Sequence, residues 1–151
     1  MNRVWVYQAD RFLSDSEVAA ITTELNSFVN SWTAHGSELA GKATVRDRLF
    51  IILEVDESQA GVTGCSIDKS VNFLKSLGTT FNVDFFDRMK VSFRSDDGIV
   101  QLVNRVQFES LIQEGSVHAD TIVFNNIIQN SDELATKWEI PFKDSWHSKV
   151  F

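Results

Sequence analysis

A continuous run of apolar residues in the first half of the chain constrains the fold more than any other feature. Residues 43–55, ATVRDRLFIILEV, begin with polar alternation, and the run from Leu49 to Leu53 contains no polar side chain. A strand in the middle of a sheet, with both faces covered, typically carries such a run. We therefore predict two strands here, or one long bent strand, with the second part inside a sheet.

The segment before this run predicts a strand followed by a capped helix. Residues 3–8, RVWVYQ, are rich in strand-forming side chains. Ser14 and Glu17 have the spacing of a capping box. Apolar side chains then recur at steps of three and four, as one buried helix face requires: Val18, Ile21, Leu25, Phe28, Val29 and Trp32. We expect this helix to end at or just before Gly36.

A second helix is expected after the apolar run. Ser66 can cap its N-terminus, and Asp68 then lies in the first turn, where the helix dipole favours an acid. Gly78 is a natural C-terminal stop. Further on, Asp97 and Gly98 are expected as the central residues of a hairpin turn. The remaining segments predict a helix, a strand and a short helix, over residues 105–114, 121–128 and 131–138.

These elements favour an α+β fold, with a mixed or antiparallel sheet covered by helices. The order of the first six elements is compatible with a ferredoxin-like βαββαβ core followed by C-terminal additions, although other topologies share that order. The length of 151 residues and the absence of a linker-like segment predict a single globular domain over residues 1–151.

Composition excludes several classes of partner. The single cysteine fits a reducing cytoplasm rather than a disulfide-built secreted fold. A net charge of −7 argues against nonspecific binding to nucleic acid. The N-terminus lacks the pattern of a signal peptide, and no apolar run approaches the roughly 20 residues of a membrane helix. We expect a cytoplasmic protein with neither a nucleic acid nor a membrane as its partner.

The main candidate for a site is the segment from Gly61 to Asp68, GVTGCSID. Glycines allow a ligand to approach the backbone closely, and the first N–H groups of a helix attract anions. No lysine follows the second glycine, so the segment is not a nucleotide P-loop. Because Asp68 already occupies the positive end of the helix, a small neutral polar or weakly anionic ligand is favoured. The alternative is a tight turn that binds nothing.

Eight residues are the predicted ligand contacts. Four belong to the segment itself, and four pair a tryptophan with a histidine near a chain turn, where they could form the wall of a pocket: Gly64, Cys65, Ser66 and Asp68, then Trp32, His35, Trp146 and His147. The alternative for the second group is that each tryptophan is buried and each histidine is solvated.

Cys65 is the one candidate for a catalytic nucleophile. A helix N-terminus stabilises a thiolate, but a nucleophile also needs a base, and the sequence does not place His35, His118 or His147 near it. The histidines have no metal-binding spacing, and no G-x-G-x-x-G is present. We expect no metal and no cofactor.

Six stretches are distributed in order over nearly the whole length of the chain: RVWVYQ, WTAHG, GCSIDKSV, VDFFDRMKV, TIVFNN and DSWH. In this order they resemble a family of small bacterial proteins of about this length. Members often carry the label "ABC transporter ATPase", which this chain contradicts, because it lacks a P-loop and is shorter than a usual transporter ATPase domain. The resemblance implies a cytoplasmic bacterial protein and brings no catalytic residue.

Three functions remain open. The leading hypothesis is a non-enzymatic module that binds a small ligand or a partner protein around residues 61–68. The second is a thiol-dependent hydrolase or transferase that uses Cys65. The third is a structural protein that forms a homo-oligomer through exposed aromatic side chains, which twelve Phe and four Trp could supply.

Overall fold

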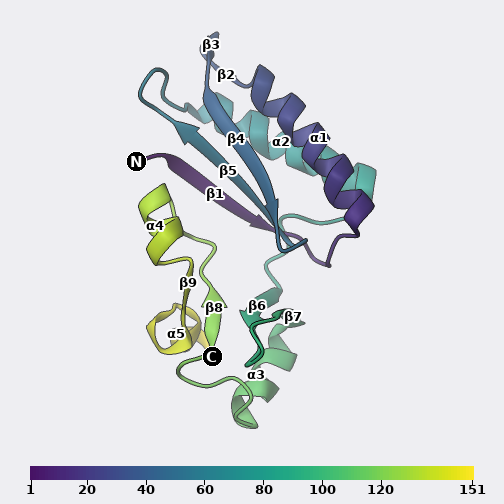
Figure 1. Ribbon diagram of the computed structural model, residues 1–151, viewed down its shortest axis with the longest axis vertical. Coiled ribbons are helices and arrows are strands. Elements are labelled where there is room, and N and C mark those ends of the chain that lie inside the picture. The colour runs from purple at the N-terminus through teal and green to yellow at the C-terminus, as the bar shows by residue number, and fades with distance from the viewer. The chain divides into compact units, whose positions relative to one another are not determined.

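The computed structural model describes all 151 residues, and the chain divides into two compact units. The first unit comprises Met1–Asp87 and Gln129–Ser131, and the second comprises Arg88–Ile128 and Asp132–Phe151. The protein is α+β, with five α-helices and antiparallel sheets (Figure 1). No helix has the length and apolar character that a membrane span requires. The division into two compact units does not test whether residues 1–151 form a single domain, so that expectation stays a prediction.

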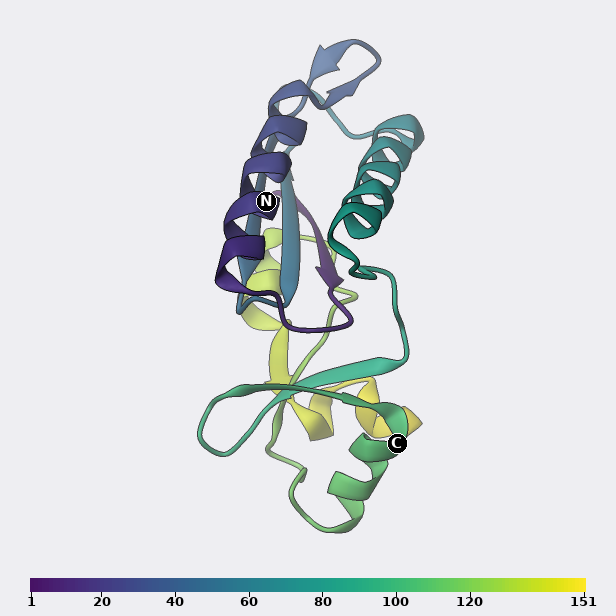
Figure 2. The same cartoon turned by 90° about the vertical axis from the view of Figure 1, so that its right-hand side faces the viewer.

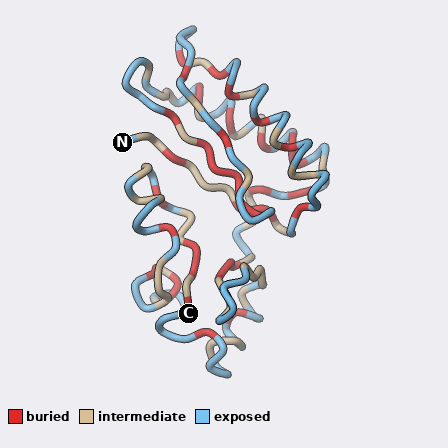
Figure 3. Tube along the Cα trace, viewed as in Figure 1, coloured by how far each residue is buried: buried red, intermediate tan, exposed pale blue.

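The first unit is built on a three-stranded antiparallel sheet. Strand β5 (Phe50–Asp56) lies between β1 (Arg3–Gln8) and β4 (Ala40–Arg46). Its residues Phe50 to Leu53 are all buried, and they form part of the buried stripe along β5 in Figure 3. The prediction of two strands, the second one central, is therefore confirmed. Residues 47–49 form the turn that joins β4 to β5, and its first two residues have positive φ angles, Asp47 (56°) and Arg48 (54°).

Helix α1 (Asp15–Ser31) begins at the predicted capping box. The Glu17 backbone N–H donates to Ser14 Oγ over 3.2 Å, and the Ser14 N–H donates to Glu17 Oε1 over 2.9 Å. The helix ends before Gly36, which lies in the turn between the short strands β2 (Thr33–Ala34) and β3 (Ser37–Glu38).

Helix α2 (Gly64–Phe81) differs from prediction at both ends. Its N-cap is Thr63, because Ser66 is the reciprocal partner in a capping box and its hydroxyl accepts the Thr63 N–H over 2.7 Å. Asp68 therefore lies beyond the first turn. Gly78 does not stop the helix, since left-handed Asn82 (φ 55°) ends it four residues later.

Both long helices pack against the same sheet face, as Figure 2 shows. The rings of Phe28 in α1 and Phe73 in α2 stack with centroids 4.5 Å apart. On the sheet, Trp5 contacts Trp32 at the end of α1, with ring centroids 6.1 Å apart. Aromatic packing thus fixes the two helices on the sheet.

The second unit has a four-stranded antiparallel sheet of its own. The strand order is β7 (Val100–Asn104), β6 (Lys90–Arg94), β8 (Ile122–Phe124) and β9 (Glu139–Pro141). The ferredoxin-like core is not evident from the strand orders, because strands expected in one sheet are divided: β5 pairs with β1 and β4, whereas β6 pairs with β7 and β8.

Four short helices complete the second unit. They are α3 (Arg105–Gln113), α4 (Ser131–Thr136, whose first residue belongs to the first unit), the 3₁₀ helix η1 (Phe142–Asp144) and α5 (His147–Val150). Phe108 of α3 is fully buried against Val91, Phe93, Val117 and Val123. The predicted helix over residues 105–114 is thus present, whereas the predicted strand over 121–128 is reduced to β8, which matches the three-residue length of its partner β9.

The predicted hairpin between β6 and β7 is confirmed, but its turn is centred one residue earlier than predicted. The Gly98 N–H donates to the Ser95 carbonyl over 2.8 Å, so Asp96 and Asp97 are the central residues. Gly98 follows them with φ 80°. A turn followed by one left-handed glycine is the usual three-residue alternative to a tight Asp-Gly turn.

We expect Gly78→Ala to destabilise the first unit by about 1–2 kcal/mol, although alanine favours a helix by about 1 kcal/mol. A Cβ at this position would overlap the carbonyl oxygen of Val83, which is backbone and cannot rotate away. Denaturant unfolding followed by circular dichroism measures the loss.

The matched control is Gly64→Ala in the first turn of the same helix. Nothing lies within 4 Å of a Cβ there, so the free energy of unfolding should stay level or rise by a few tenths of a kcal/mol. Equal effects of the two substitutions would show that the Val83 contact does not constrain position 78.

Candidate functional site

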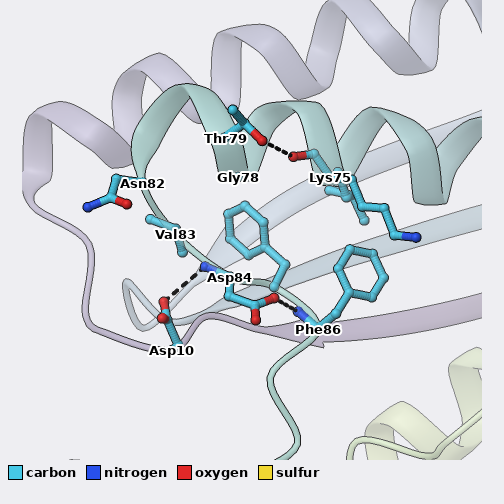
Figure 4. Close-up of a pocket in the computed structure, with 10 residues that line it drawn as sticks. Asp10, Lys75, Gly78, Thr79, Asn82, Val83, Asp84 and Phe86 are labelled. Carbon is cyan, nitrogen blue, oxygen red and sulfur yellow. Dashed lines mark hydrogen bonds between the residues drawn. The ribbon is translucent and has the colours of Figure 1, made fainter.

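A pocket of about 390 Å³ lies at the C-terminal end of α2 in the first unit. The last turns of the helix form one side, and the segment that follows the helix forms the other (Figure 4). Asp10, which follows β1, completes the lining. The lining residues are Asp10, Leu74, Lys75, Gly78, Thr79, Asn82, Val83, Asp84, Phe85 and Phe86.

Local hydrogen bonds explain why the chain turns back beneath the helix at this point. The N–H groups of Asn82 and Val83 both donate to the Gly78 carbonyl. The Asp84 N–H then donates to Asp10 Oδ1 over 3.0 Å, and the Phe86 N–H donates to Asp84 Oδ1 over 2.8 Å (Figure 4). The two carboxylates thus hold the segment that forms the lower side of the pocket.

The pocket has an apolar wall. Leu74, Val83 and Phe85 are buried, and Phe85 has only 3% of its surface exposed. The Phe86 ring meets the ring of Tyr7 edge-on with centroids 5.4 Å apart. Burial raises the pKa of Tyr7, which is opposed by its hydrogen bond with Ser70. The wall is therefore continuous with the interior of the first unit.

Charged groups surround this wall. The carboxylates of Asp10 and Asp84 line the pocket, and the Lys75 ammonium lies 5.8 Å from the centroid of the Phe86 ring. No basic residue lies in the last turn of α2. The end of α2 therefore depends on another element for a positive charge.

Arg11 supplies that charge. Its Nη2 donates to the Phe81 carbonyl over 2.9 Å, and its Nε donates to the Asn82 carbonyl over 3.4 Å. Two further bonds, of 2.9 and 2.7 Å, join it to the Glu17 carboxylate. The hydrogen bond from Arg11 is the main reason why the pKa of Glu17 is lowered to about 2, and the same bond raises the pKa of Arg11. The Arg11 guanidinium thus places a positive charge at the negative end of the α2 dipole, and the same group pairs with the Glu17 carboxylate.

The other end of α2, where we predicted the site, brings together only part of the predicted set. Trp32 Nε1 donates to the Ser66 carbonyl over 2.8 Å, and Lys69 Nζ donates to Thr33 Oγ1 over 3.3 Å. Trp32 has only 2% of its surface exposed, and Ser66 is fully buried. These two residues therefore join α1 to α2 within the core. For Trp32 this is the alternative to lining a pocket, namely burial in the core.

The remaining predicted residues near this end are exposed. Gly64 and Cys65 lie in the first helical turn, and Asp68 follows on the surface. His35 lies at the tip of the β2–β3 turn with φ 52°. Cys65 is a free cysteine, and no hydrogen bond joins it to a histidine.

Trp146 and His147 belong to the second unit. Their rings stack with centroids 3.8 Å apart. His147 is buried, its Nδ1 has no hydrogen-bond partner, and burial together with the charge of Arg105 lowers its pKa to about 4. This pair contributes to the packing around Phe108, whose ring centroid lies 6.2 Å from that of His147.

Sequence reasoning missed the pocket at the end of α2. Its signals were present but local: a glycine inside a helical pattern, an asparagine that can adopt a left-handed conformation, and Asp84 two residues before Phe86, the spacing of an Asx-turn. None of these predicts that Asp10 lies opposite Asp84, because that contact spans 74 residues.

No group of three or more histidine, cysteine, aspartate or glutamate side chains is placed to hold a metal ion. Comparisons with family models, with curated proteins and with solved structures give no match to this chain. What the structure defines is an α+β protein of two compact units, with a pocket at the end of one long helix.

Proposed function

We propose that this protein is a non-enzymatic binding module that holds a small molecule in the pocket at the C-terminal end of α2. The observation that supports the proposal is the pocket itself. Its volume of about 390 Å³ falls in the range of small-molecule sites, and a buried apolar wall combined with a few charged groups is typical of them.

This location replaces the one proposed from sequence. Cys65 and Thr79 lie 14 residues apart on α2, which corresponds to about 20 Å along the helix axis. The two ends of a helix also carry opposite partial charges. A ligand at the C-terminal end therefore meets a different electrostatic environment from the anion-favouring end that contains Cys65.

The thiol-dependent and homo-oligomeric alternatives are not proposed. Cys65 is exposed but has no histidine hydrogen-bonded to it. The large exposed apolar side chains are distributed over both units: Met1, Phe12, Met89, Ile99, Val106, Ile127 and Val150.

We expect Thr79→Phe to abolish the binding of small molecules at this pocket. Thr79 lines the pocket and its side chain is exposed, so a phenyl ring there would fill the space without displacing a buried group. A fragment library screened against ¹⁵N-labelled wild-type protein should shift amide resonances of residues 74–86. The variant should lose at least about tenfold in affinity for each such fragment.

The matched control is Thr80→Phe. Thr80 is the next residue on α2, it is exposed, and its hydroxyl donates to a carbonyl four residues earlier over 3.1 Å, as that of Thr79 does. It does not line the pocket, so the variant should bind fragments like the wild type. If no fragment shifts residues 74–86, or if both variants bind equally well, the proposed function is wrong.

A further inference from the structure

We infer that the pocket at the end of α2 selects ligands that carry a protonated amine on an apolar body. The inference rests on the proposed binding function and specifies the chemical class of its ligand. Two features of the lining support it: the balance of formal charge, and the apolar and aromatic surface beside the carboxylates.

The formal charge of the lining is negative. Asp10 and Asp84 contribute two negative charges and Lys75 contributes one positive charge, which leaves one negative charge in excess. The nearby Arg11 interacts electrostatically with Asp10, but its guanidinium is paired with the Glu17 carboxylate, so this pair adds no net charge to the balance. A cationic ligand is therefore attracted, and an anionic ligand is repelled, by the lining as a whole.

Asp84 is the carboxylate best placed to meet such a ligand. One of its oxygens accepts the Phe86 N–H over 2.8 Å, and the other has no partner within the protein. The side chain belongs to an exposed residue, so an incoming ammonium can reach it. A charge-assisted hydrogen bond to that oxygen would be stronger than one between neutral groups.

Aromatic and aliphatic groups of the lining would contact the apolar body of the ligand. Phe86 supplies aromatic surface to the lining of the pocket, and the Lys75 ammonium lies 5.8 Å from the centroid of its ring. Leu74, Val83 and Phe85 offer buried apolar surface next to it. A ligand that combines an ammonium with an apolar body would satisfy both kinds of surface at once.

Three probes that share one phenylethyl body and differ in the attached polar group test this inference: 2-phenylethylamine, 2-phenylethanol and 3-phenylpropionate. We expect the amine to bind wild-type protein at least about fivefold more tightly than the alcohol, and the carboxylate to bind most weakly. Titrations monitored through the amide resonances of residues 74–86 give the three dissociation constants. Raising the salt concentration should weaken the binding of the amine and leave the affinity for the alcohol unchanged.

Asp84→Asn should remove the preference for the amine. The amide oxygen of asparagine can still accept the Phe86 N–H, so the variant loses a charge and keeps the turn. Asp68→Asn removes the same charge from the other end of α2, where Asp68 is exposed, and should keep the preference.

The outcomes separate this inference from the proposed function. The inference is overturned if the alcohol or the carboxylate binds as tightly as the amine, if the amine does not bind, or if Asp84→Asn keeps the preference. In each of these cases the proposed function still stands if other fragments bind the wild type and Thr79→Phe blocks them. If no fragment binds at this pocket, the proposed function and the inference are both wrong.

Discussion

Phe108→Ala is expected to lower the free energy of unfolding of the second unit by about 3–5 kcal/mol. Phe108 has no exposed surface, and its ring is the centre of an aromatic cluster. The centroids of its neighbours lie 5.0 to 6.2 Å away, and these neighbours come from β6, η1, α5 and the C-terminal residue: Phe93, Phe142, His147 and Phe151. Truncation would remove a contact to each element at once.

Hydrogen exchange followed by mass spectrometry can assign this loss to the second unit. Amides of β6 and β8 should exchange much faster in the variant, and chemical denaturation should give the size of the loss. Val106→Ala on the same helix is the control, since Val106 is 72% exposed and its truncation should change stability by less than about 0.5 kcal/mol. Similar losses in both variants would show that Phe108 is not the centre of this core.

Acidification should destabilise the second unit through His147. The pKa of this buried histidine is about 4, against an ordinary value of 6.5, so the unfolded state binds the proton more readily between these values. The contribution of neutral His147 to the free energy of unfolding is therefore fully present above about pH 6.5 and decreases as the pH falls towards 4. Below pH 4 this group causes no further loss of stability. Between pH 7 and pH 5 the loss should be about 2 kcal/mol.

His147→Phe tests this expectation, because a phenyl ring can stack on Trp146 and cannot take up a proton. The difference in unfolding free energy between pH 7 and pH 5 should shrink by about 2 kcal/mol relative to the wild type. Val106→Ala, at an exposed residue of the same unit that carries no titratable group, should leave the difference unchanged. An unaltered pH dependence in His147→Phe would mean that His147 is not held neutral by the fold.

The two ends of α2 show how a local pattern and a tertiary contact can point to different candidate sites. Gly61, Gly64 and Cys65 are conspicuous in the sequence, and the helix does begin there. The structure uses Ser66 for capping and buries its backbone against Trp32. At the other end, Gly78 was interpreted as a stop, whereas its missing side chain admits the Val83 carbonyl and so helps to form the pocket.

By itself the sequence determined the features that depend on neighbours a few residues apart. The capping box of Ser14 and Glu17, the central strand β5, the β6–β7 hairpin and the α+β class are all encoded by short-range spacing and local backbone preference. Such signals act within one turn or one strand, so they remain visible without the rest of the chain.

Only the tertiary structure decided which strands share a sheet and where a pocket forms. The order of elements is compatible with one sheet, but β5 and β6 lie in different sheets because strand pairing is set by contacts between distant segments. The pocket likewise depends on the hydrogen bond between Asp84 and Asp10, and the charge at the end of α2 depends on Arg11, some 70 residues earlier in the chain. No local pattern specifies such contacts, since each is stabilised only once both segments are packed on the same sheet.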